Sequence, residues 1–281
     1  AVVVSRAECA RRSGEEFGSP ALSGTRDGTI VPTQIAVGDV MSSAWTIFQG
    51  QMGFCIATVL VAALAYIALQ FALQIGFVGV SLILEQVGDA AVGIILMVLF
   101  IGVLYISILA LQTFLTIGVL RIMLMIARGG DPSLGLLFTG GRWLVTALLA
   151  NIIIGFLSTL LAYAPLMAIV GFAAMFDLSM EIAFVIAIPL AILIGVWIMI
   201  SVSMVPMLII DQDAGVMESI RTSIQITNGN RVQLLALGLI GIVLYLLGFI
   251  ACIIGLLIAA PYIVMIYTVA YLRMTGQSGA A

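Results

Sequence analysis

Four amide side chains, Gln70, Gln74, Gln112 and Asn151, have the type and spacing that could form a polar site in this 281-residue chain. Gln70 and Gln74 are one helical turn apart, and Gln112 stands one turn before Thr116, so on helices each pair shares a face. These groups could line a small cavity for a neutral or amphiphilic solute. Alternatively, they hydrogen-bond between neighbouring helices, as such side chains commonly do in membranes.

Residue types that support catalysis or bind metals are scarce. The chain contains no histidine, and all ten of its basic residues are arginines. This composition excludes Ser-His-Asp triads, histidine metal sites and lysine Schiff bases. Cys9, Cys55 and Cys252 are far apart in the sequence and form neither a disulfide framework nor a Cys-x-x-Cys metal motif. We therefore predict no enzymatic activity, no catalytic residue, no metal site and no cofactor.

Two loops contain paired carboxylates, Glu85 with Asp89 and Asp177 with Glu181. Two such pairs could meet and hold a divalent cation. The exclusion of charge from the bilayer explains the same pattern without an ion. We therefore interpret these loops as polar turns outside the membrane.

The elements that position these groups are apolar helices. Hydrophobic residues make up 63% of the chain and charged residues 8%, against about 25% charged in a soluble domain. Five segments without charge each exceed the ~20 residues that cross a ~30 Å hydrocarbon core, and the last is long enough for two crossings. The sequence predicts an all-α polytopic membrane protein with six transmembrane helices, at about residues 53–76, 90–125, 143–165, 182–209, 232–250 and 256–273.

The arginines predict the topology because positive charge stays on the cytoplasmic side of loops. One loop carries Arg121, Arg128 and Arg142, a second carries Arg221 and Arg231, and the loops between them are purely acidic. Both termini are therefore expected in the cytoplasm. The net charge is −3 and there is no basic patch, so no nucleic-acid partner is expected.

Two segments outside the spans have the pattern of amphipathic helices. In residues 37–51 one helical face carries Val37, Val40, Met41, Ala44 and Phe48. In residues 216–227 the corresponding face carries Val216, Met217, Ile220, Ile224 and Thr227. Helices of this kind lie in the plane of the membrane interface.

The starts of two short helices are also predicted. Asp131 precedes Pro132, a pair typical of the cap and the first position of a helix. Asp211 and Asp213 are expected to complement the amino end of the helix that follows them. Together the interfacial helices are expected to form a cytoplasmic collar, which includes Trp45, Phe48, Phe138, Glu218 and Arg221.

The sequence also predicts how the chain divides into a membrane domain and two tails. Residues 1–33 read as a polar, disordered cytoplasmic tail, residues 34–275 as one six-span membrane domain, and residues 276–281 as a C-terminal tail. Similar glycine and phenylalanine positions indicate three tandem units, each an interfacial helix followed by a two-span hairpin. Chance matches in apolar sequence are the alternative. The predicted units cover about residues 35–126, 131–210 and 214–274.

Three segments and four single positions carry a resemblance to known proteins: residues 44–48, 205–211 and 218–230, with Gly255, Pro261, Ala270 and Tyr271. They resemble a bacterial family of six-span inner-membrane proteins, akin to the membrane domain of some glycerophosphodiester phosphodiesterases and to related stand-alone proteins. The resemblance covers roughly residues 35–275 and implies an all-helical module of the inner membrane. The phosphodiesterase domain is absent, so no catalytic residue is carried over.

These observations favour a non-enzymatic membrane protein that serves as a scaffold, accessory subunit or lipid-interacting module of a larger assembly. Its expected partners are membrane lipids and other membrane proteins. The alternative is a passive channel or transporter for a small neutral or amphiphilic solute, with the four amides facing its cavity. A proton or cation relay is not predicted, because no carboxylate falls near the middle of a span.

Overall fold

The computed structural model describes residues 25–26, 29–30, 34–84, 90–176 and 179–277. Two-residue strands, β1 (Thr25–Arg26) and β2 (Thr29–Ile30), pair antiparallel. The rest of the ordered structure is helical, with three long hairpins. They are formed by α3 (Met52–Leu84) with α4 (Ala90–Ala127), α5 (Gly141–Met175) with α6 (Met180–Val202), and α9 (Arg231–Ile250) with α10 (Cys252–Met274).

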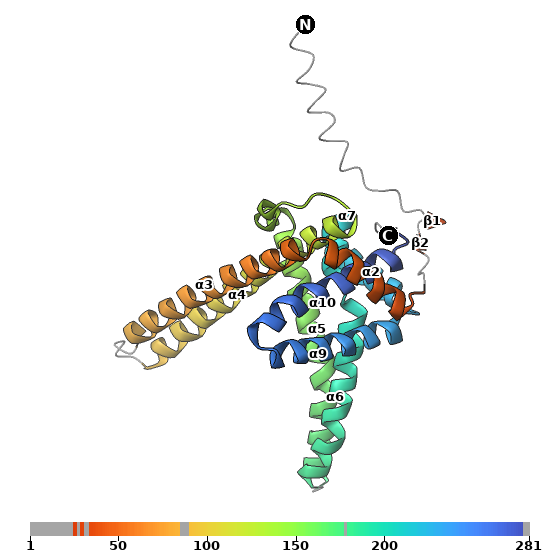
Figure 1. The fold of residues 1–281 in the computed structure, drawn as a ribbon. Coiled ribbons are helices and arrows are strands. Elements are labelled where there is room, and N and C mark those ends of the chain that lie inside the picture. Colours follow the sequence, from red (N-terminus) through yellow and green to blue (C-terminus); the bar gives the residue numbers. More distant parts are fainter. Residues whose placement is uncertain (1–24, 27–28, 31–33, 85–89, 177–178, 278–281) are drawn as a thin grey trace.

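Two of the hairpins project from a common base. Figure 1 shows the α3/α4 and α5/α6 hairpins pointing away from each other, from a region that contains α2 (Val37–Gly50), α7 (Val205–Gln212) and α10. We call this base the hub; it also includes η1 (Leu134–Phe138), α8 (Val216–Thr227) and residues 113–127 of α4. The first arm consists of α3 and of α4 as far as residue 112. The second arm is the α5/α6 hairpin.

Six helices are long and apolar enough to cross a membrane, which confirms the predicted all-α polytopic class. Several of them exceed the predicted spans. α3 has 33 residues and continues to Leu84, and α5 has 35 residues and passes through Pro165 to Met175. At about 1.5 Å per residue these helices are longer than a ~30 Å hydrocarbon core, so they must tilt or protrude. Proline is tolerated inside such helices because neighbouring groups satisfy the freed backbone atoms.

The predicted fourth span, residues 182–209, is not one continuous helix. α6 ends at Val202, and α7 begins at Val205 with Pro206 in its first turn. The carbonyl of Ser201 accepts a hydrogen bond from the Ser223 hydroxyl at 2.8 Å. A proline removes a backbone donor and interrupts the helical ladder, and α8 supplies a hydroxyl donor to one carbonyl next to this break. The chain can therefore turn into the hub, where most of α7 is buried.

The apolar face predicted for residues 37–51 is the face that α2 buries. Val40, Ala44 and Phe48 are fully buried, and α2 packs on α10. Arg273 of α10 donates to the Ser43 hydroxyl at 2.8 Å and lies 3.9 Å from the Asp39 carboxylate. The apolar face of α2 is thus covered by protein rather than by lipid.

The face by which α8 packs overlaps the predicted apolar face only in part. Thr227 is buried, and Val216 and Ile220 are half-buried against the core. Met217 and Ile224 are exposed, and the structure buries Ser219 and Ser223 instead. Small side chains allow helices to approach closely in a membrane, so hydroxyl groups form part of the packing face of α8.

The start of η1 was predicted incorrectly. Ser133, rather than Asp131, is the cap residue, and η1 is a five-residue 3₁₀ helix, not an amphipathic α-helix. η1 lies directly on α4 at Gly118, where an added Cβ would stand 2.2 Å from the Leu137 carbonyl oxygen. This contact holds Leu137 fully buried, and it requires glycine at the contact point.

The last hairpin closes tightly through its glycines. α9 and α10 are separated by Ala251, and a Cβ at Gly255 would stand 2.5 Å from the Gly248 oxygen. A short helix precedes each of the three hairpins in the element order. The three-unit repeat itself stays a prediction.

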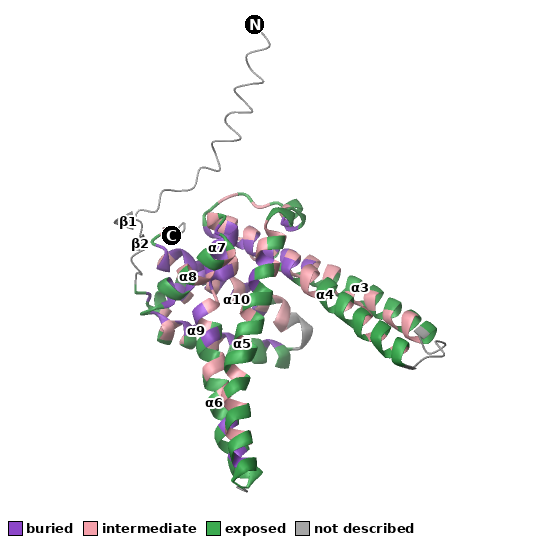
Figure 2. Ribbon diagram, turned by 180° about the vertical axis from the view of Figure 1, so that it is seen from behind, coloured by how far each residue is buried: buried purple, intermediate pink, exposed green. Residues whose placement is uncertain are grey.

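Burial divides the molecule into two zones. In Figure 2 the buried residues gather in the hub, whereas the arms are mostly exposed or intermediate. The largest fully buried side chains include Tyr271, Phe48, Met123 and Leu208, which come from four different helices. The hub is therefore the packed core, and it sets the positions from which both arms leave.

Candidate functional site

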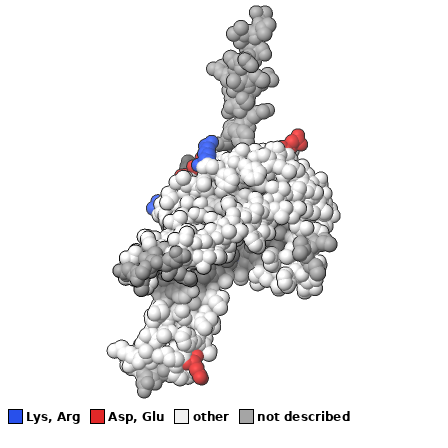
Figure 3. Space-filling view, turned by 90° about the vertical axis from the view of Figure 1, so that its left-hand side faces the viewer, with Lys and Arg blue, Asp and Glu red and all other residues white. Residues whose placement is uncertain are grey.

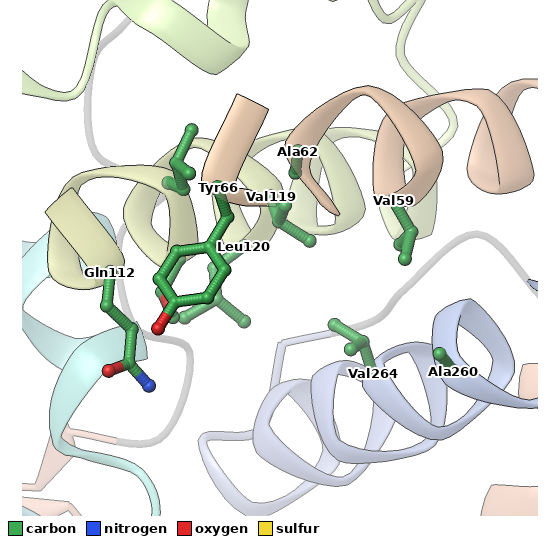
Figure 4. A pocket seen from close by; sticks show the side chains of 10 residues that line it. Val59, Ala62, Tyr66, Gln112, Val119, Leu120, Ala260 and Val264 are labelled. Carbon is green, nitrogen blue, oxygen red and sulfur yellow. The ribbon is translucent and has the colours of Figure 1, made fainter. Parts of the chain in front are cut away.

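A cavity of about 360 Å³ lies where α3, α4 and α10 diverge. Figure 4 shows Tyr66 and Gln112 on one side of it and Ala260 and Val264 of α10 on the other. Its volume falls within the ~300–1,000 Å³ typical of small-molecule pockets. The lining is apolar with three neutral polar groups: Val59, Ala62, Tyr66, Gln112, Leu115, Thr116, Val119, Leu120, Ala260 and Val264. Such a site suits an apolar or neutral amphiphilic group rather than an ion.

The structure does not bring the four predicted amides together. Gln112 lines the cavity, whereas Gln70, Gln74 and Asn151 are not among its lining residues. Gln74 is exposed, and the buried Oε1 of Gln70 has no hydrogen-bond partner among the described residues. Asn151 Nδ2 instead donates to Thr113 Oγ1 at 3.0 Å and links α5 to α4. Only one of the four therefore has the position that a solute pathway through this cavity needs.

The hub contains a buried polar network that the sequence did not predict. Asp211 of α7 has only 6% of its side chain exposed and pairs at 2.5 Å with Arg128, which directly follows α4. Its other oxygen, Oδ2, accepts hydrogen bonds from the Tyr271 hydroxyl at 2.8 Å and from Gln277 Nε2 at 3.1 Å. A buried carboxylate is costly unless it is paired and hydrogen-bonded. Asp211 thus joins α4, α7, α10 and the chain after α10 through one side chain.

The predicted capping role of Asp211 and Asp213 is wrong. Gly215 is the cap residue of α8, and no side chain caps that helix. Asp213 instead accepts a hydrogen bond from Trp143 Nε1 at 2.5 Å and forms an ion pair with Arg142. Both carboxylates serve contacts between hairpins, because α7 turns them towards α4 and α5.

A second polar cluster lies where η1 meets α4 and α5. Arg121 donates from Nη1 to the Thr139 hydroxyl at 2.5 Å, and its guanidinium lies 4.6 Å from the centre of the Trp143 ring. The guanidinium of Arg142 lies 5.2 Å from the same ring. We call Arg121, Thr139, Arg142, Trp143 and Asp213 the arginine cluster. It brings two cations and one carboxylate to the surface of the hub.

The predicted collar residues have unequal environments. Phe48 is fully buried beside Tyr262, and Trp45 is partly exposed with its ring edge towards the same tyrosine, 5.2 Å between centroids. Phe138, expected to be equivalent to Phe48, is 57% exposed, and its neighbour Leu137 takes the buried position.

Glu218 and Arg221 are both exposed on α8. Among the described residues no ion pair joins them, although their spacing would allow one. The collar therefore consists of one packed helix, α2, and of two helices with exposed surfaces, η1 and α8.

The paired acidic loops are mostly outside the part of the chain that the structure describes. Glu85, Asp89 and Asp177 are not among the described residues, and neither are residues 1–24, 27–28, 31–33 and 278–281 of the predicted tails. Glu181 is described and lies in the first turn of α6.

Comparisons with family models, curated proteins and solved structures found no match for this chain. The resemblance to the six-span bacterial family therefore stays a prediction.

Proposed function

We propose that this protein is a non-enzymatic module of a bacterial inner membrane, acting as a scaffold or accessory subunit that contacts lipids and other membrane proteins through its first arm. The observation that supports this proposal most is the exposure of that arm. In the most apolar 18-residue window of α4, no residue is buried. The aromatic side chains of Phe71 and Tyr105 are each 67% exposed. Apolar surface of this extent is covered by a membrane or by another protein.

The hub supplies the rigid base that such an arm needs. α4 continues from the exposed arm into the hub, where Ile122, Met123 and Ala127 are fully buried. Arg128, just beyond the end of α4, pairs with Asp211. Any protein that docks on the arm would therefore be held at a fixed angle to the hub.

The distribution of charge supports a cytoplasmic position for the charged end of the hub and for both termini. The ion-paired arginines Arg128, Arg142 and Arg273 all lie in or next to the hub. Glu181 lies instead at the start of α6, in the part of the second arm that is farthest along the chain from the hub. In the face drawn in Figure 3 the basic groups lie at the hub end, where acidic groups lie as well, and one acidic group lies near the tip of an arm. Positive charge is retained on the cytoplasmic side of membrane proteins.

A photo-crosslinking amino acid introduced in cells tests the scaffold proposal. Replacement of Phe71 or Tyr105 by benzoylphenylalanine retains an aromatic ring on the first arm. Phe249, which is 68% exposed at the end of α9, is the matched control outside that arm. We expect a discrete protein adduct from the two arm positions and none from Phe249.

Two results would contradict the proposal. One is the absence of any protein adduct from Phe71 and Tyr105, with purification of the protein in mild detergent as a lone species. The other is the same set of adducts from all three positions, which would indicate random collisions in the membrane. Sidedness is measured separately, by reaction of an impermeant maleimide with a cysteine placed at Gln225 in α8 or at Met180 in α6. We expect only the second to react from outside the cell.

A further inference from the structure

The arginine cluster has more positive than negative charge. Arg142 pairs with Asp213, but Arg121 has no carboxylate partner among the described residues. Both guanidiniums lie over the same indole ring, that of Trp143. Like charges so close together repel each other, and one carboxylate neutralises only one of them. The cluster is therefore one negative charge short.

The unused hydrogen-bond donors of Arg121 point to the kind of group that would supply this charge. Its guanidinium has five N–H groups, of which the described contacts occupy Nη1, with the carbonyl and hydroxyl of Thr139 as acceptors. A phosphate oxygen pair matches the planar fork of a guanidinium and binds it with charge-assisted hydrogen bonds. A phosphate could also bridge Arg121 and Arg142.

The surroundings of the cluster favour a lipid over a soluble anion. Tryptophan is enriched at the membrane interface. Leu134 and Phe138 of η1, the helix that ends just before Thr139, are exposed, and so is Val145 of α5, two residues after Trp143. The cluster therefore lies on an apolar surface that a glycerol backbone and acyl chains could cover. Anionic phospholipids of the cytoplasmic leaflet are attracted to such juxtamembrane arginines.

We propose that the arginine cluster binds the phosphodiester of an anionic phospholipid, with Arg121 and Arg142 holding the phosphate and the exposed apolar residues of η1 and α5 contacting the lipid body. This inference deepens the proposed lipid contact and rests on the proposed position of the hub at the membrane surface. It assigns a lipid class and a location to that contact, and it requires no protein partner.

Native mass spectrometry of the purified full chain tests the proposal by titration with phosphatidylglycerol, phosphatidylcholine or glycerol 3-phosphate. Arg121→Gln removes the unpaired cation and leaves the Arg142 to Asp213 pair in place. Arg221→Gln is the matched control, because Arg221 is an exposed arginine of α8 outside the cluster. Thermal unfolding of each variant shows whether it is folded, and Arg142→Gln is the second test should Arg121→Gln not fold.

We expect the wild type to prefer phosphatidylglycerol over phosphatidylcholine. Arg121→Gln should weaken phosphatidylglycerol binding about tenfold, the effect of losing one charge-assisted hydrogen bond, and Arg221→Gln should leave it within about twofold. Arg121→Lys should recover only part of the affinity, since it keeps the charge but not the fork.

Three results would overturn the proposal: equal binding of the two lipids, equal losses in Arg121→Gln and Arg221→Gln, or equally tight binding of glycerol 3-phosphate. The last would assign the site to a soluble phosphate. None of these results depends on a protein partner, so this test and the crosslinking test can fail independently.

Discussion

α4 and α10 show opposite relations between hydrophobicity and burial. α4 contains the more hydrophobic 18-residue window, yet none of that window is buried, whereas 56% of the corresponding window of α10 is buried. α10 packs against α2, α3, α4 and α9. In a membrane the lipid tails are as apolar as leucine, so hydrophobicity alone does not drive helices together. The most apolar surface can therefore remain outside, while shape and hydrogen bonds decide which helix forms the core.

The largest effect is expected where α2 covers α10. Phe48→Ala empties a fully buried site beside Tyr262, with ring centroids 5.6 Å apart, and should cost about 3–5 kcal/mol of unfolding free energy. Phe71→Ala on the first arm is the control and should change it little. The midpoint of thermal unfolding in one detergent measures both, and equal losses would contradict the division between hub and arm.

The next effect concerns the charged centre of the hub. Asp211→Ala leaves Arg128 and the Tyr271 hydroxyl without their partner and should cost about 2–3 kcal/mol, because Arg128 is partly solvated and loses less than a fully buried ion would. Tyr271→Phe should cost about 1 kcal/mol. In the double variant the two losses should not add, since both side chains belong to one network. Additive losses would argue against the network.

Two glycines of α4 compare its buried and exposed parts directly. Gly118→Ala forces η1 away from α4 and should cost about 1–3 kcal/mol. Gly102→Ala has nothing within 4 Å of the added Cβ and should be neutral or slightly stabilising. Trypsin cleavage at Arg142 offers a second measure, because displacement of η1 should speed it only in the first variant.

The smallest effect is expected at the hydrogen bond between the second arm and α4. Asn151→Ala should cost about 0.6 kcal/mol, the average for hydrogen bonds between transmembrane helices. Thr113→Val should cost a similar amount, and a double-mutant cycle measures their coupling. If Asn151 had a role in solute passage instead, its loss would change the uptake of a neutral solute without any coupling to Thr113.

The predictions from sequence succeeded where a local pattern was enough. Charge-free segments marked the six apolar helices, and the face of α2 followed from the spacing of Val40, Ala44 and Phe48. They failed where the partner of a side chain lay far away in the chain. Asp211 was interpreted as a cap of the helix that follows it, yet its ion-pair partner, Arg128, comes 83 positions earlier.

The same reason explains the errors at α7 and α8. Pro206 was inside a segment apolar enough to be one span, and only α8 supplies the hydroxyls that make a break there tolerable. The packing face of α8 carries Ser219 and Ser223, which no hydrophobic pattern would select. Gln112 could be named as a cavity residue from its type, but the cavity itself requires α3, α4 and α10 together.

The sequence by itself determined that this chain forms six apolar helices and that its charges lie between them or towards their ends, because a charged or unpaired polar group in hydrocarbon is costly wherever the helix goes. Only the tertiary structure decided which of these helices is the core. Lipid and protein are equally apolar surroundings for a leucine, so close contacts such as Gly118 with Leu137, and polar pairs such as Arg128 with Asp211, distinguish the packed hub from the exposed arms.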